Sequence, residues 1–140
     1  MDRFFLAAAA SFAFLAVGAG AFGAHALKER IPPERLPTFE TGVRYTLYHA
    51  FGLFIVVWFR TAGPDQLSET IAGVAFIAGI VLFGGSLMAL SLTGVRRWGV
   101  ITPIGGVCFL VGWAALIVAA VTAPLDFAQV HQVTALLVGG

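Results

Sequence analysis

Four long apolar runs, separated by short charged segments, decide what this chain can fold into. They cover residues 4–26, 41–60, 70–94 and 98–123, and each approaches the ~20 residues that a helix needs to cross a bilayer. Backbone polar groups cannot stay unpaired in hydrocarbon, so apolar runs of this length have to be helical. Only 11% of the 140 residues are charged, against about a quarter in a soluble domain. The sequence therefore predicts an all-α membrane protein, a four-helix transmembrane bundle with short loops, in a single domain over residues 1–124.

Two segments depart from this pattern. The segment between the first and second runs contains Pro32, Pro33 and Pro37. We expect these prolines to break any helix and to form the longest loop, with a short interfacial helix starting within residues 34–41. Residues 125–140 interleave polar and apolar residues at helical spacing, and at roughly 16 residues they are too short to span. They are predicted to form an amphipathic tail helix at the membrane interface.

The basic residues predict the orientation of the chain. Six of the eight lie in or beside the first and third loops: Lys28, Arg30, Arg35, Arg44, Arg96 and Arg97. The opposite side holds only Arg3 and Arg60. Because basic loops stay in the cytoplasm, we expect both termini to be external. The formal net charge of +1 gives no reason to expect a nucleic-acid partner.

Small residues recur at spacings of three and four within the apolar runs, as expected where helices in lipid pack closely. The glycines that we assign to helix packing are Gly20, Gly23, Gly79, Gly105 and Gly112. The stripes of small residues are predicted to form the bundle interior, with the Phe and Leu residues, Leu116 among them, facing lipid.

Five polar residues near the first loop form the candidate site: His25, Glu40, Arg44, Tyr45 and His49. A helical hairpin places the end of the first run and the start of the second at the same membrane face, within about 10 Å of each other. Glu40 and Arg44 are spaced i, i+4, as are Tyr45 and His49, so each pair shares one helix face. We predict a chain of polar contacts running inward from Glu40 and His25 through Tyr45 to His49.

The same residues allow other interpretations. His25 and His49 face each other across the loop in a hairpin, which is the arrangement needed for two ligands of a haem or metal. No third zinc ligand accompanies them, however, and Cys108 is the only cysteine, so we predict no metal, no cofactor and no catalytic residues. A small transporter or channel is a further alternative, although no carboxylate lies in the middle of any run.

Several motifs resemble one known family. They are residues 20–25 (GAFGAH), 41–45 (TGVRY) with His49, 82–87 (LFGGSL), and 102–106 (TPIGG) with Phe109, Gly112 and Trp113. In order and spacing the chain resembles the small bacterial inner-membrane proteins catalogued as domain of unknown function 423, which also has mitochondrial relatives. The resemblance implies a four-helix, multi-pass protein of the bacterial inner (plasma) membrane. It brings no established activity, cofactor or catalytic residue, and it does not extend past about residue 124.

The leading hypothesis is a non-enzymatic integral membrane protein whose polar cluster docks a partner at the cytoplasmic interface. The expected partner is the bilayer lipid or another membrane protein, and a homo-oligomer remains open. The two alternatives are a small transporter or channel, and a haem- or metal-binding redox subunit that uses His25 and His49.

Overall fold

The computed structural model describes residues 1–62 and 67–122. Within these ranges the chain is helical and contains no strand. The elements are α1 (Asp2–Phe22), the π-helical η1 (Gly23–Leu27), the 3-10 turn η2 (Pro33–Arg35), α2 (Leu36–Ala62), α3 (Leu67–Gly79), the π-helical η3 (Ile80–Gly84), α4 (Gly85–Thr93) and α5 (Trp98–Thr122). Several run on into one another, which leaves four helices long and apolar enough to cross a membrane. The predicted all-α, four-helix membrane protein is confirmed. The predicted tail, residues 125–140, lies outside the described residues.

The second spanning helix begins earlier than expected. It extends over Pro33–Thr61 rather than starting at residue 41. Pro33 opens η2 and Pro37 is the second residue of α2, and neither breaks the helix. The backbone nitrogens of a first helical turn have no intrahelical partner, so proline is tolerated there and its fixed φ favours helix initiation. The prolines therefore start this helix, contrary to the prediction that they would interrupt it.

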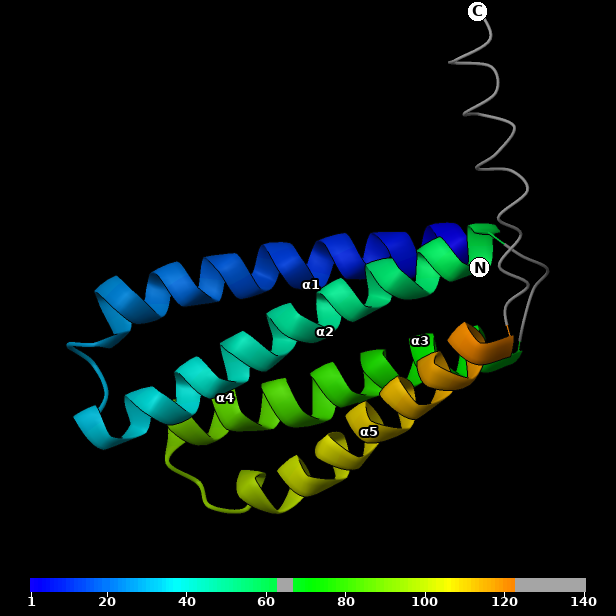
Figure 1. Ribbon diagram of the computed structural model, residues 1–140. Coiled ribbons are helices and arrows are strands. Elements are labelled where there is room, and N and C mark those ends of the chain that lie inside the picture. Colours follow the sequence, from blue (N-terminus) through cyan, green and yellow to red (C-terminus); the bar gives the residue numbers. More distant parts are fainter. Residues whose placement is uncertain (63–66, 123–140) are drawn as a thin grey trace, which may run out of the picture.

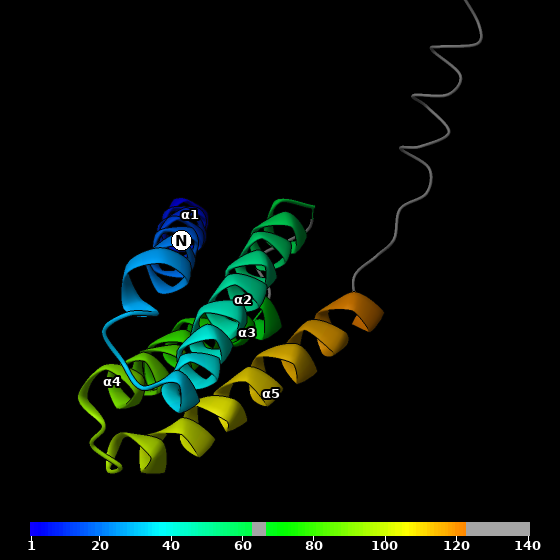
Figure 2. The ribbon, with the colours of Figure 1, turned by 90° about the vertical axis from the view of Figure 1, so that its left-hand side faces the viewer.

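Consecutive spans run in opposite directions. The α2 helix lies between α1 on one side and the continuous helix α3–η3–α4 on the other (Figure 1). Seen from the end of the bundle, α5 lies across α3 and η3, on the far side from α1 (Figure 2). Met1 and the end of α5 lie at one end of the bundle, and the η1–η2 and α4–α5 loops lie at the other (Figure 1). The bundle is thus open between α2 and α5, which both pack on the third span.

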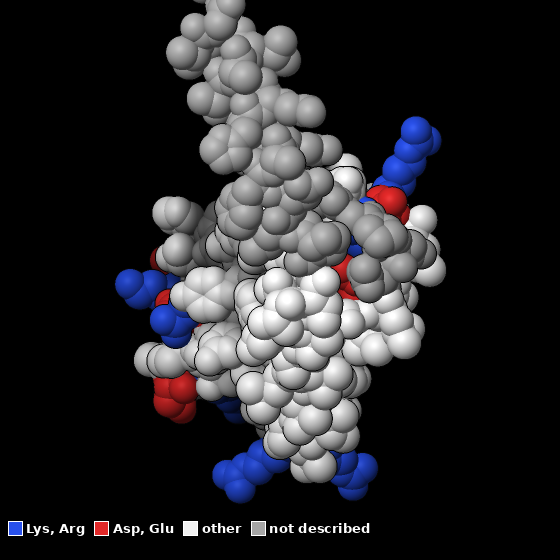
Figure 3. Space-filling view, turned by 45° about the vertical axis from the view of Figure 1, so that its right-hand side comes forward, with Lys and Arg blue, Asp and Glu red and all other residues white. Residues whose placement is uncertain are grey.

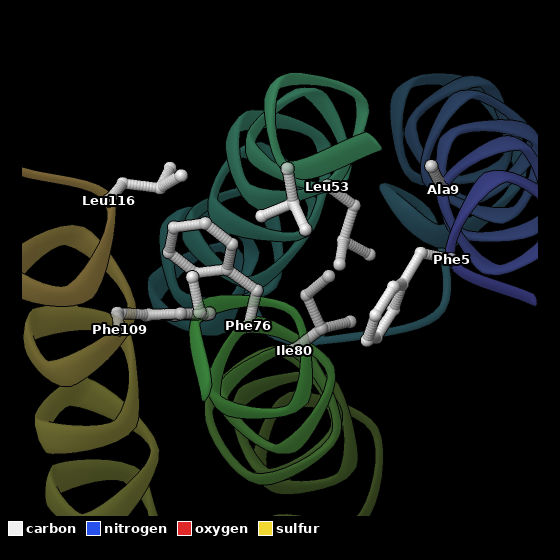
Figure 4. Packing of buried hydrophobic residues seen from close by; sticks show 9 residues of the cluster. Phe5, Ala9, Leu53, Phe76, Ile80, Phe109 and Leu116 are labelled. Carbon is white, nitrogen blue, oxygen red and sulfur yellow. The ribbon is translucent and has the colours of Figure 1, made fainter. Parts of the chain in front are cut away.

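The core is built from large side chains contributed by every span. Figure 4 shows them converging between the helices, with the ring of Phe76 near the centre. The buried cluster consists of Phe5, Ala9, Leu53, Val56, Ala72, Phe76, Ile80, Phe109 and Leu116. Burying rings and aliphatic side chains at this density fills the interior with apolar contacts, and the described part of the bundle has a packed centre.

The packing glycines lie where another helix comes close. A Cβ on Gly20 would lie 3.5 Å from Val43 Cγ1, and one on Gly23 would lie 2.8 Å from Phe39 Cε1. The remaining three glycines have aromatic residues against them: Gly79 meets the ring of Phe109, Gly112 the ring of Phe76, and Gly105 the backbone of Phe83. Four of these five glycines thus provide a recess that a phenylalanine of a neighbouring helix occupies, and Gly20 faces Val43 instead.

Leu116 and several phenylalanines are buried, which corrects the expectation that such residues face lipid. Leu116 is only 5% exposed, because it follows Gly112 by four residues and so shares its face of α5. Phe14, by contrast, is 79% exposed on α1. On the face shown in Figure 3, the described surface is broadly uncharged, with most charged side chains at its margins. Large apolar side chains therefore occur both in the interior of the bundle and on its outer surface.

Candidate functional site

The structure divides the predicted polar cluster between two surfaces. Glu40 and Arg44 line a shallow cleft of about 290 Å³ against Gly20 and Gly23, on the α1 side of α2. The ring of His49 instead points toward α5, and His25 is exposed on η1. One residue step turns a helix by about 100°, so the two ladders of α2 face different neighbours. Of the predicted chain of contacts, the link between Tyr45 and His49 is present, with ring centroids 6.0 Å apart. Within the described residues no hydrogen bond or ion pair joins His25 or Glu40 to Tyr45.

Glu40 and Arg44 do not form an ion pair, although their i, i+4 spacing would allow one. Both side chains are exposed, and the ion pair found between described residues lies at the opposite end of the bundle. Exposed i, i+4 pairs contribute little to stability even when they form. These two residues are therefore available at the surface of the α1–α2 cleft.

His49 joins α2 to α5. The indole Nε1–H of Trp113 donates to Nε2 of His49 over 3.2 Å, and Nδ1 of His49 lies 2.7 Å from the carbonyl oxygen of Tyr45. Because Nε2 accepts, the proton of the neutral ring is on Nδ1, which donates to that carbonyl. The imidazole also stacks on Phe109, with ring centroids 3.4 Å apart and planes at 7°. Both nitrogens of this buried ring are thus engaged in holding two helices together.

An aromatic groove surrounds this contact, between α2 and α5 with η3 beneath it. We call it the α2–α5 groove; its volume is about 320 Å³ and it is lined by Tyr45, Tyr48, His49, Phe83, Gly106, Phe109, Leu110 and Trp113. Tyr45 and Tyr48 are 40% and 55% exposed on its rim. Phe109 and Trp113 lie near the middle of the 25-residue α5. The groove therefore opens toward the hydrocarbon region, below the membrane interface.

A second polar contact links α5 to the third span. Ser86 Oγ and Thr102 Oγ1 lie 2.8 Å apart, and the Ser86 hydroxyl is also 3.1 Å from the carbonyl oxygen of Phe83. These residues belong to the 82–87 and 102–106 motifs. Hydroxyl contacts of this kind are common between membrane helices, where water is not available as a partner.

Sequence reasoning missed a polar group at the opposite end of the bundle. The Arg60 side chain is 4% exposed, and its Nε donates to Asp2 Oδ1 over 2.6 Å. Its Nη1 donates to Thr70 Oγ1 over 2.8 Å, and its Cζ lies 5.8 Å from the centre of the Phe5 ring. Arg60 thus ties together the ends of three helices. An antiparallel hairpin places the first turn of α1 beside the last turn of α2, so the Asp2–Arg60 pair could have been predicted from the sequence.

Glu69 lies in the first turn of α3 and is 2% exposed. Its Oε2 is buried and has no hydrogen-bond partner among the residues that the structure describes. The apolar and small residues that follow it in α3 gave no sign of this burial. Among the described residues, no group of three His, Cys, Asp or Glu side chains is placed to hold a metal ion.

These features define an integral membrane protein of the helical-bundle class, with four apolar spans joined by interhelical polar contacts. The chain belongs to the family described as "Protein of unknown function (DUF423)", whose model matches residues 19–106. This confirms the resemblance carried by the motifs.

Named relatives are bacterial and share most of their length with this chain. The UPF0382 membrane protein YwdK of Bacillus subtilis (strain 168) is 48% identical over 119 residues, covering 85% of this chain and 97% of the relative. A UPF0382 membrane protein of Staphylococcus epidermidis (strain ATCC 12228) is 40% identical over 117 residues, covering 84% and 94%. A UPF0382 membrane protein of Staphylococcus aureus (strain bovine RF122) is 41% identical over 117 residues, covering 84% of this chain and 94% of the relative. No solved structure matches the chain.

Proposed function

We propose that this protein is a non-enzymatic accessory protein of the bacterial inner membrane, which binds a transmembrane helix of a partner protein in the α2–α5 groove. The observation that carries the proposal is the pair of exposed tyrosines at the groove. No hydrogen bond of the Tyr45 or Tyr48 hydroxyl occurs within the described part of the chain. An unpaired hydroxyl in hydrocarbon is unfavourable, so a partner with polar groups at this depth is favoured over lipid tails alone.

The wall of the groove also suits a helix. Gly106 is on this wall, and a Cβ there would come no closer than 3.9 Å to the Phe83 ring. Its backbone is therefore open to close approach, which is the usual means of helix association in lipid. Aromatic rings on both sides supply the contact area, and the His49–Trp113 bond keeps the two walls in position.

The two alternative functions receive less support from the geometry. His25 and His49 lie on different surfaces, and the nitrogens of His49 are both engaged, so paired ligation of a haem or metal would break the contact with Trp113. A transporter or channel needs a polar path through the bundle, whereas the centre of the described bundle is filled by Phe5, Leu53 and Phe76.

Photocrosslinking in native membranes tests the docking proposal. Benzoylphenylalanine replaces Tyr48 or Leu110 at the groove and, as a control, Phe14 on the exposed face of α1. We expect a discrete protein adduct from the two groove positions and none from Phe14. Gly106→Leu should abolish the adduct formed from position 48, because the new side chain fills the groove.

The identity of the adduct decides the outcome. A different membrane protein, captured from the groove and lost with Gly106→Leu, supports the proposal. An adduct with a second copy of this chain would contradict the proposal of a different partner and would indicate self-assembly through the groove. Adducts with lipid alone, or equal capture from Phe14, would show that no partner helix occupies the groove.

We further propose that the η1–η2 and α4–α5 loops face the cytoplasm and that both termini are external. Six of the eight basic residues favour this orientation, and the chain places these two loops at one end of the bundle (Figure 1). Alkaline phosphatase fused to the carboxyl terminus should be active, and green fluorescent protein fused there should not fluoresce after export. If the green fluorescent protein fusion fluoresced and the phosphatase fusion were inactive, the orientation would be the reverse of the one proposed.

A further inference from the structure

A second cleft lies at the loop end of the bundle, between the start of α2 and the end of α4. Its volume is about 340 Å³, and it is lined by Arg35, Thr38, Leu90, Ser91, Gly94 and Arg96. This size is at the lower end of the range of small-ligand sites, about 300–1,000 Å³. Two arginines line it and no carboxylate does. The cleft is therefore electropositive at the level where the spanning helices end.

Arg35 is held in this cleft by the shape of the α4 terminus. Gly94 ends α4 with φ +71°, and its N–H donates to the Leu90 carbonyl over 2.8 Å. A Cβ at Gly94 would lie 2.6 Å from both Nη atoms of Arg35, so the guanidinium rests directly on the glycine. The negative end of the α4 dipole is worth only about half a charge, which offsets part of one arginine. The charge of Arg96 is left without compensation.

No carboxylate compensates the two guanidinium groups. Among the described residues, the ion pair that forms is Asp2–Arg60, at the other end of the bundle. Glu34 is next to Arg35 in sequence, but it is exposed and does not line the cleft. Two like charges that share a cleft repel each other, and an anion between them would remove this cost.

The other lining residues indicate what kind of anion fits. Guanidinium groups pair with phosphate oxygens through two parallel N–H···O bonds. No bond of the Thr38 hydroxyl is present among the described residues, so it can donate a further one, whereas the Ser91 hydroxyl donates to the Leu87 carbonyl over 2.8 Å. Leu90 gives the cleft an apolar wall next to the ends of the spans. This combination matches a phosphate that carries acyl chains.

We propose that the Arg35–Arg96 cleft binds the phosphate of an anionic phospholipid at this face of the membrane. Basic pockets between transmembrane helices are a recurrent form of anionic lipid site. The proposal is independent of the α2–α5 groove, which lies on another side of α2 and is lined by other residues.

Lipid binding to the purified full chain in neutral detergent tests the site. Phosphatidylglycerol is titrated, with phosphatidylcholine and inorganic phosphate as separate arms, and binding is measured by native mass spectrometry. The double variant Arg35→Gln/Arg96→Gln should weaken phosphatidylglycerol binding by about tenfold or more, because each lost charged hydrogen bond corresponds to at least that factor. Arg30→Gln/Arg97→Gln removes the same charge from exposed positions outside the cleft and should change binding less than about twofold.

The remaining arms separate the alternatives. Arg96→Gln alone alters an exposed loop residue, so it keeps the test valid if the double variant does not fold, and it should also weaken binding. Equal losses in the two double variants would mean diffuse attraction and would overturn the site. Equal binding of phosphatidylcholine, or displacement of the lipid by millimolar inorganic phosphate, would overturn the assignment to an anionic lipid.

Discussion

Gly105→Ala should lower the free energy of unfolding by about 1–3 kcal/mol, the usual cost of overpacking a close contact. A Cβ at this position would lie 2.8 Å from Phe83 Cα and even nearer to the Phe83 backbone nitrogen. A side chain can rotate away from such a clash, but the backbone of η3 cannot, so α5 would have to shift. The change is measured by thermal or denaturant unfolding of the purified protein in detergent.

Gly106→Ala is the matched control for this experiment. The same methyl group is added one residue further along the same helix, where it would meet nothing closer than 3.9 Å. Both variants receive the same intrinsic gain in helix propensity, so the difference between them isolates the steric contact. Equal stabilities for the two variants would mean that α5 and η3 do not approach as closely as described.

The spans were predictable because the physics that sets them is local. Hydrocarbon demands paired backbone groups over the thickness of a bilayer, and an apolar run of that length can meet this demand only as a helix. The start of α2 was misjudged because Pro33 and Pro37 were treated as helix breakers. Proline breaks a helix only in its interior, and whether a position is interior depends on where the first turn begins.

The packing of the bundle was predictable in kind but not in detail. The small-residue stripes showed where helices approach, yet the partners of each glycine depend on crossing angles that no single helix determines. The ring of Phe76, for example, lies against both Gly52 of α2 and Gly112 of α5. Burial of Leu116 could have been deduced, since it shares a face with Gly112.

The candidate site was misplaced for a related reason. Depth along the axis was estimated for Tyr45 and His49, and the estimate used the rise per residue but not the rotation. Depth placed Tyr45 near His25 and His49 further inward, whereas the rotation turns both residues toward α5. The Asp2–Arg60 contact was not predicted because it lies at the end of the hairpin that is poorer in polar residues.

The His49–Trp113 bond should show coupling in a double-mutant cycle. Trp113→Phe removes the indole donor and leaves Nε2 of His49 unpaired, while His49→Phe keeps a ring against Phe109 and leaves the indole unpaired. We expect each change to destabilise the protein in detergent by about 0.5–2 kcal/mol, the range found for interhelical hydrogen bonds in membranes. The double variant removes both polar groups at once, so its cost should fall short of the sum by a similar amount.

Two features of the chain sharpen this cycle. The Tyr45 carbonyl that accepts from Nδ1 is also the i−4 acceptor of the His49 backbone N–H, so His49→Phe does not leave it unpaired. Trp58→Phe makes the same substitution at a tryptophan that is 62% exposed and whose indole has no hydrogen bond within the described part of the chain, and it should have little effect. Strictly additive costs at positions 49 and 113, or an equal loss at position 58, would show that the bond does not join α2 to α5. Coupling without loss at position 58 would establish His49 as a structural link between these helices and explain why its nitrogens are not free to act as ligands.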